Sequence, residues 1–256
     1  MRNNSVLTKT LRGFAVAAAW IGIWWLASVL AKAAGAALVL PTPPAVVKAL
    51  GALLVQKSFY ASCLRSLLRV LGGWALGMCA GTALALASFF SRTLRALFSP
   101  MLHIVKATPV ASFIIAALVL MGAGRVPVFT GMLISTPVVW ANLSEGLLSP
   151  APALLEMAGA FQMTRKNKIR FIYLPAVRPY FTAAATTAMG LSWKASIAAE
   201  VICTPKGSIG AGIYNAKIYL ETPELFAWTL AVIVLSVLLE KALSAVLKAS
   251  ERRASA

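Results

Sequence analysis

Few side chains in this chain could carry out chemistry, and those that could stand far apart. The three cysteines, Cys63, Cys79 and Cys203, form no CxxC pair, and His103 is the only histidine. Metal centres and redox dithiols need clusters of such ligands, and so do most catalytic sites. We therefore predict no metal site and no catalytic residue, and we do not expect the chain to be an enzyme.

Two charged residues occupy an otherwise apolar segment. Lys194 and Glu200 follow Ser192 and Trp193 in a stretch that is long enough to cross a membrane. A charge inside a membrane segment is costly, so it commonly faces a cavity or a partner. We predict that Ser192, Trp193, Lys194 and Glu200 contribute to a translocation pathway. The alternatives are packing for Trp193 and, for Lys194, a structural contact with Glu200 or a carbonyl group, although their spacing makes a pair on one helix poor.

A third isolated charge lies in a basic segment. Glu156 is the only acidic residue of the segment 154–175, which reads LLEMAGAFQMTRKNKIRFIYLP. Pro152 can open a helix with an apolar side, and Thr164 can cap a second short helix that Pro175 would end. Two short helices with apolar faces and one carboxylate are typical of a surface that fits a groove on another protein.

The composition shows what must position these residues. Of the 256 residues 60% are hydrophobic and only 12% are charged, and the mean hydropathy is +0.82. Ordinary soluble domains carry about 25% charged residues. A soluble fold of this size could not bury so much apolar surface, which places the chain in a bilayer.

The apolar runs predict an all-α polytopic membrane protein with six transmembrane helices in a single domain. A bilayer core of about 30 Å needs roughly 20 residues of helix. A short amphipathic helix on the surface is predicted over Ala45–Val55, and a long loop over 145–178. The six predicted spans are 14–31, 68–91, 101–122, 126–144, 179–202 and 225–247.

The basic residues predict the orientation. Of the 24 Lys and Arg residues, 14 fall on the side that holds both termini, Arg92–Pro100 and the 145–178 loop, and eight fall on the other. The positive-inside rule therefore places both termini and the 145–178 loop in the cytoplasm. The net charge of +17 does not indicate nucleic-acid binding, because long apolar runs separate the basic residues and no basic-aromatic stripe forms.

Three glycines in the second predicted span are spaced four residues apart. Gly73, Gly77 and Gly81 form a small-xxx-small stripe of the kind that lets two helices approach closely. The alternative is that these glycines reflect only the high glycine content of membrane helices.

The segment 154–175 resembles the EAA loop of permease subunits of bacterial ATP-binding-cassette (ABC) importers. The family pattern is Glu-Ala-Ala, a glycine, and then an apolar residue and Leu-Pro at fixed distances. Met157 replaces the first alanine, Gln162 stands where the family usually has glycine, and Gly159 lies three residues earlier. The residues that match the pattern are Glu156, Ala158, Ile172, Leu174 and Pro175.

Further short motifs, in this order along the chain, resemble the nitrate/sulfonate/taurine branch of the binding-protein-dependent transport inner-membrane components. They are Leu40-Pro-Thr-Pro, Arg69-Val-Leu-Gly-Gly-Trp, Thr108-Pro-Val-Ala, Trp193 with Ala199-Glu200, and Ser208-Ile-Gly-Ala-Gly-Ile. The resemblance implies a type I ABC importer permease fold in the bacterial inner membrane. It also implies a pathway formed by two copies of the chain.

The resemblance also implies partners. Two ABC ATPase subunits would dock on the 145–178 loop, and an extracytoplasmic substrate-binding protein would deliver the ligand. The chain has no GxxxxGK[ST] motif and no Asp, so no cofactor is expected here and ATP and magnesium would be bound by the partner ATPase. The ATPase-coupling residues implied are Glu156, Met157, Ala158, Gly159, Ile172, Leu174 and Pro175.

The sequence leaves the substrate open. The branch resemblance implies a small anion such as a sulfonate, nitrate or a taurine-like compound, or else a vitamin or pyrimidine precursor. The alternative function is a secondary transporter driven by an ion gradient. Such transporters tend to carry mid-membrane carboxylates or inverted repeats, whereas here Glu200 lies near the end of its span and no repeat is visible.

Overall fold

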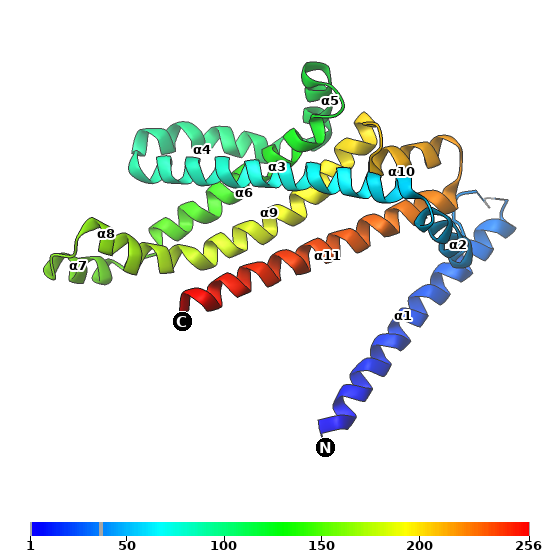
Figure 1. The fold of residues 1–256 in the computed structure, drawn as a ribbon, viewed down its shortest axis with the longest axis horizontal. Coiled ribbons are helices and arrows are strands. Elements are labelled where there is room, and N and C mark those ends of the chain that lie inside the picture. The colour runs from blue at the N-terminus through cyan, green and yellow to red at the C-terminus, as the bar shows by residue number, and fades with distance from the viewer. Residues whose placement is uncertain (1, 36–37, 256) are drawn as a thin grey trace. The chain divides into compact units, whose positions relative to one another are not determined.

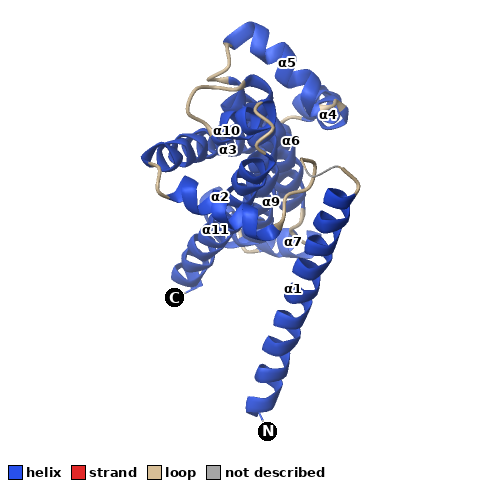
Figure 2. Cartoon of the chain, turned by 90° about the vertical axis from the view of Figure 1, so that its right-hand side faces the viewer, coloured by secondary structure: helices blue, strands red, loops and turns tan. Residues whose placement is uncertain are grey.

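A computed structural model describes residues 2–35 and 38–255. Within these ranges every regular element is a helix (Figures 1 and 2). The long helices are α1 (Arg2–Ala33), α3 (Lys57–Phe90), α6 (Val126–Leu148), α9 (Leu174–Cys203) and α11 (Thr222–Ser255). The shorter elements are α2 (Pro43–Leu54), α4 (Arg92–Ala107), α5 (Val110–Met121), α7 (Pro152–Ala160), α8 (Arg165–Lys168), the π-helical turn η1 (Ile169–Tyr173) and α10 (Ile209–Ile218).

The chain divides into two compact units. The smaller unit contains Met1–Ala61 and Gly212–Val232, and the larger contains Ser62–Ala211 and Ile233–Ala256. The larger unit holds every residue predicted above to be functional, so the description concentrates on it.

Four helical stretches in the described residues are long and apolar enough to cross a bilayer. They match four of the predicted spans, although α3 begins at Lys57, eleven residues before the predicted start of its span. The four stretches are Ala15–Ala33, Lys57–Phe90, Val126–Leu148 and Thr222–Ala249.

The predicted span 101–122 is broken. The structure has two helices there, α4 and α5, which bend by 99° around Thr108 and Pro109. Pro109 disfavours helical geometry at the residue before it, and Thr108 has an extended ψ of 134°. The bent pair raises the number of candidate spans in the described residues to five if it is counted as one.

The predicted span 179–202 lies inside α9, which is 30 residues long. Its length is sufficient to cross a bilayer. Lys194, Glu200 and several serines and threonines lower its hydropathy, and it is not among the candidate spans. The count of six spans therefore stays a prediction.

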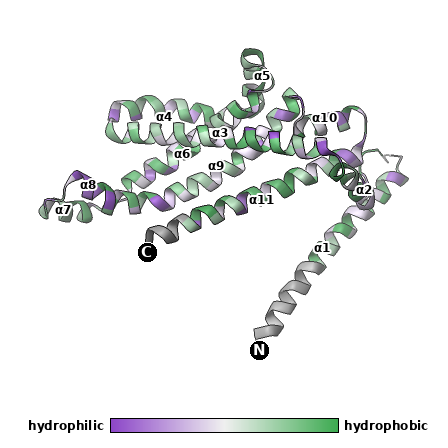
Figure 3. Ribbon diagram, viewed as in Figure 1, coloured by the Kyte–Doolittle hydropathy of each residue, from purple (hydrophilic) through white to green (hydrophobic). Residues whose placement is uncertain are grey.

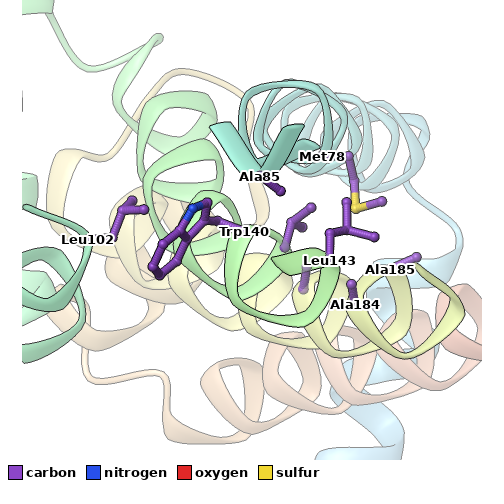
Figure 4. Close-up of a cluster of buried hydrophobic side chains, with 9 residues drawn as sticks. Met78, Ala85, Leu102, Trp140, Leu143, Ala184 and Ala185 are labelled. Carbon is purple, nitrogen blue, oxygen red and sulfur yellow. The ribbon is translucent and has the colours of Figure 1, made fainter. Parts of the chain in front are cut away.

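The core of the larger unit lies where α3, α4, α6 and α9 meet around Trp140 (Figure 4). Helices α6 and α9 run side by side (Figure 1). The indole Nε1 of Trp140 donates a hydrogen bond to Ser88 Oγ at 3.1 Å, so its one polar atom is satisfied. The cluster also includes Met78, Ala85, Leu102, Leu143, Ala184 and Ala185.

The glycine stripe of α3 packs against α6. A Cβ atom added at Gly73 would lie 2.6 Å from the carbonyl oxygen of Val128, and one added at Gly81 would lie 2.7 Å from that of Thr136. No real Cβ sits so close to a backbone oxygen, so any larger residue would push the helices apart. The close-approach interpretation of Gly73, Gly77 and Gly81 is confirmed.

In the smaller unit, α2 corresponds to the surface helix predicted over Ala45–Val55. It buries Val46 and Leu53 but also exposes the apolar Val47 and Leu54, so its exposed face is partly apolar. Elsewhere in this unit the rings of Phe59 and Trp228 pack with their centroids 5.0 Å apart.

Candidate functional site

The first candidate site is the 145–178 loop, whose outer helix is α7. Pro152 starts this helix, as the sequence predicted, and Ala151 is its N-cap residue. Ala158 is fully buried, whereas Met157 and Phe161 are 49% and 76% exposed. Glu156 is exposed, and within the described residues it forms no ion pair with Arg165, Lys168 or any other cation. The helix therefore presents an unpaired carboxylate on a partly apolar surface.

The bend after α7 explains why glycine would suit position 162. Gln162 has a φ of 49°, in the left-handed region that favours glycine. The amide of Gln162 donates to Gly159 O at 2.9 Å and that of Met163 donates to Ala158 O at 2.9 Å, which is the Schellman pattern of a helix end. The bend thus keeps a glycine-type geometry although the residue is glutamine.

Gln162→Gly is expected to stabilise this bend by about 1 kcal/mol, because it removes the steric cost of a left-handed side chain. Amide hydrogen exchange at Met163 should slow roughly fivefold if it occurs by local opening. Gln162→Val is the matched control and should accelerate the same exchange. Equal exchange in all three proteins would contradict the strain assigned to Gln162.

The second arm of the 145–178 loop, residues 164–175, begins as predicted and ends differently. Thr164 Oγ1 accepts a hydrogen bond from the amide of Asn167 at 3.4 Å and caps α8, which carries the hydrophilic residues seen in Figure 3. The prediction that Pro175 ends this helix is wrong, because α8 continues through η1 into α9. In the π-helical turn the Leu174 amide bonds Ile169 O, and Pro175, which has no N–H to donate, follows directly after this turn as the second residue of α9.

The implied coupling residues of this arm differ in exposure. Ile172 is 5% exposed, whereas Leu174 is 50% exposed. The ring of Tyr173, between them, meets the ring of Phe89 edge-on at 5.6 Å. This contact joins the second arm of the loop to the end of α3.

The second candidate site lies on α9. Ser192 and Trp193 are buried, and neither Ser192 Oγ nor Trp193 Nε1 has a hydrogen-bond partner among the described residues. Lys194 is exposed. It belongs to a stripe of exposed positions that recur every three or four residues along one face of α9: Ala183, Thr187, Leu191, Lys194, Ala198 and Ile202.

Glu200 sits apart from Lys194 in a buried polar cluster. Its side chain is 1% exposed, and its Oε1 lies 3.0 Å from Nη1 of Arg69 in an ion pair. Its Oε2 accepts hydrogen bonds from Ser66 Oγ at 2.6 Å and from the Gly210 amide at 3.2 Å. Ser66 Oγ in turn accepts from the Ile209 amide at 3.0 Å.

This Glu200 cluster (Ser66, Arg69, Glu200, Ile209 and Gly210) joins α3, α9 and the start of α10. Each carboxylate oxygen has at least one donor, as a buried charge requires. A Cβ at Gly210 would collide with the backbone and Cβ of Glu200, so only glycine lets the two segments come this close. The structural pair between Lys194 and Glu200 that the sequence left open does not form, since the carboxylate is held by Arg69.

Sequence reasoning missed Ser66, Arg69 and Gly210 as site residues. Arg69 and Gly210 were present in the motifs quoted for the family resemblance, in two separate pieces. The signal that could have joined them is charge balance: an acid predicted near the end of a membrane span needs a cation at similar depth. Arg69 is the basic residue at the predicted start of the second span.

Comparisons with known proteins agree with this architecture. Residues 76–256 match the family described as "Binding-protein-dependent transport system inner membrane component". A "Probable ABC transporter permease protein" of Brucella melitensis is 25% identical over 251 residues, 96% of each chain. The taurine transport system permease protein of Escherichia coli is 23% identical over 230 residues, 87% of this chain and 82% of that protein.

A solved structure shares the fold. The crystal structure of an amino acid ABC transporter with histidines contains a chain that superposes with a TM-score of 0.60 at 18% sequence identity. The match covers 77% of this chain and 94% of the other. The helical arrangement is thus similar to that of a chain of this amino acid ABC transporter.

Proposed function

Because the chain belongs to the family of binding-protein-dependent transport system inner membrane components, we propose that it forms, as a dimer, the translocation pathway of an ATP-driven importer for a small anion. The chain is an ABC transporter permease and not an enzyme. The proposal concerns its assembly, its source of energy and its substrate.

The observation that carries the proposal is the surface of α7. An exposed, unpaired Glu156 stands beside the exposed side chains of Met157 and Phe161. Exposed apolar side chains around one charge suit insertion into a groove of a partner with a basic residue. We assign this surface to the binding of an ABC ATPase subunit, one for each of the two copies of the permease. The ATPase subunits would bind the ATP and magnesium.

The second arm completes the proposed coupling surface. Leu174 and Pro175 are exposed at the start of α9, while Ala158 and Ile172 are buried and hold the two arms in shape. Gly159, exposed on α7, leaves room for the ATPase to approach the backbone. Movement of the ATPases would thus reach α9 directly, because the arm continues into that helix.

The pathway is proposed to follow the exposed stripe of α9. A lysine on a stripe facing lipid would be costly, whereas the same lysine facing a water-filled cavity between two copies would not. Lys194 is therefore assigned to the pathway. Ser192, Trp193 and Glu200, predicted to belong to it, are buried behind this stripe, and we propose that they fix the position of α9.

A small anion is the proposed substrate. Relatives of this chain are named for aliphatic sulfonates, taurine, nitrate and bicarbonate. A cationic side chain on the pathway would attract such ligands over cations. An extracytoplasmic binding protein would select among them.

The proposed setting is the bacterial inner membrane. Six spans, with the bent α4–α5 pair and α9 as two of them, would put both termini in the cytoplasm, in agreement with the excess of basic residues on that side. The 145–178 loop would then face the ATPases.

Purification of the tagged chain from native membranes tests the proposal. We expect an ABC ATPase to co-purify, and vesicles that contain the complex and the binding protein should take up a sulfonate only when ATP is on the ATPase side. An impermeant thiol reagent should label Lys206→Cys and Arg165→Cys from opposite sides of the same vesicles. Uptake driven by an ion gradient, without any ATPase, would favour the secondary transporter instead.

A further inference from the structure

A cavity of about 230 Å³ lies in the larger unit where α3 ends, α4 begins and α6 ends. Its polar wall consists of two serines, Ser88 and Ser144, and of two arginines, Arg92 and Arg95. The ring of Phe89 forms part of the apolar wall. The volume exceeds what a single water molecule needs, so a small ion with part of its hydration shell can enter.

The charged side chains that line this cavity are all positive. No carboxylate lines it, and in the described part of the chain neither Arg92 nor Arg95 is paired with an acid. The cavity also adjoins the first turn of the 16-residue helix α4, where the helix dipole adds positive potential. Two unpaired guanidinium groups on the wall of one cavity favour a bound anion.

The serines supply an independent observation. Ser144 Oγ is buried and has no hydrogen-bond partner among the described residues. Ser88, 4% exposed, already accepts the indole hydrogen bond of Trp140, so its own hydroxyl proton remains available to donate. Buried polar atoms normally have partners, and a group bound in the cavity would supply one for the hydroxyl of Ser144.

We propose that this cavity binds an oxyanion of the phosphate type, held by the guanidinium groups of Arg92 and Arg95 and by the hydroxyl groups of Ser88 and Ser144. Each guanidinium group presents its N–H donors as a fork, and no carboxylate lines the wall. This arrangement suits a group that carries several oxygens on one central atom. The same chemistry is present in an anionic lipid headgroup and in free phosphate.

The site has a direct route to the 145–178 loop. Phe89 lines the cavity and its ring packs edge-on against Tyr173 of η1, at 5.6 Å between centroids. Occupation of the cavity fixes the end of α3 and, through this contact, the second arm of the loop. This inference stands on the cavity itself and does not depend on the proposed function.

Binding to the purified full-length permease in detergent tests the proposal with two probes. Radiolabelled inorganic phosphate is measured by equilibrium dialysis, and phosphatidylglycerol added to the micelles is measured by its retention in native mass spectrometry. Arg92→Gln and Arg95→Gln should each weaken binding about tenfold or more, because each variant removes a charge-assisted hydrogen bond to the anion. Ser144→Ala should have a smaller effect in the same direction.

Lys248→Gln is the matched control, because Lys248 is an exposed cation on α11 that does not line this cavity. Phosphate binding that the arginine variants lose and the control keeps would support a site for a free anion. The same pattern for phosphatidylglycerol alone would support a lipid headgroup site. Absence of binding for both probes, or equal binding in all variants, would overturn the proposal.

Discussion

Arg69→Met is expected to lower the free energy of unfolding by about 3–5 kcal/mol, the usual effect of removing one partner of a buried ion pair. The carboxylate of Glu200 is 1% exposed and cannot reach water in the folded chain. Without Arg69 it keeps only the hydroxyl of Ser66 and the amide of Gly210 as donors, and its charge is uncompensated.

Glu200→Gln should be milder than Arg69→Met. The amide oxygen of glutamine can still accept from Ser66, and Arg69, whose side chain is 19% exposed, can turn toward water. The double variant should be less destabilised than the sum of the two single variants, because it leaves no unpaired charge. Strict additivity would mean that the pair contributes no coupling energy.

The thiol of Cys203 offers the measurement. Cys203 lies at the end of α9 and is 6% exposed, so in a chain whose other two free cysteines, Cys63 and Cys79, are replaced by serine, a thiol-reactive dye reports its exposure on heating. Lys194→Met is the contrast on the same helix: Lys194 is exposed and unpaired in the described structure, so the unfolding temperature should not change. Anion uptake by Lys194→Met should nevertheless fall if this residue faces the pathway.

The sequence predicted well those features that depend on neighbouring residues. The N-terminal cap of α8 needs only Thr164 and the amide of Asn167, three positions later, and it forms as expected. The expectation that Pro175 ends its helix fails because the general rule for proline takes no account of a π-helical turn placed just before it. The break at Thr108 and Pro109 was visible in the residues but was outweighed by the apolar run around it.

The Glu200 cluster could not be derived in this way. Ser66 and Glu200 are 134 positions apart, and no periodicity relates residues on different helices. The glycine stripe of α3 stands between these cases: its spacing predicts a close approach, but only the structure identifies α6 as the partner. Long-range pairing is decided by packing, which a single sequence records only indirectly.

Glu156→Ala is expected to weaken the binding of the ATPase by about 2–5 kcal/mol, or to uncouple ATP hydrolysis from transport. The carboxylate is exposed and unpaired in the described structure, so its removal should leave the permease itself unchanged. Without Glu156, a basic residue in the groove of the ATPase would be left buried without its counter-ion.

Glu240→Ala provides a matched control. Glu240 is also an exposed acid, but it lies on α11 and outside the 145–178 loop. A general effect of net charge on binding would appear in both variants, whereas a specific contact would appear only at Glu156. Thermal unfolding should be the same for both, since neither carboxylate is buried.

Glu156→Lys should impair coupling more than Glu156→Ala, because it adds repulsion to the lost contact. The measurement is recovery of the ATPase on the tagged permease, followed by the ratio of ATP hydrolysed to substrate moved in vesicles. ATPase recovery and coupling should both be highest in the wild type, lower in Glu156→Ala and lowest in Glu156→Lys. This order would place Glu156 in the contact with the ATPase. If all three proteins recover the ATPase equally and stay coupled, another part of the 145–178 loop must hold the partner, and the exposed pair of Met157 and Phe161 on the same helix becomes the next surface to alter.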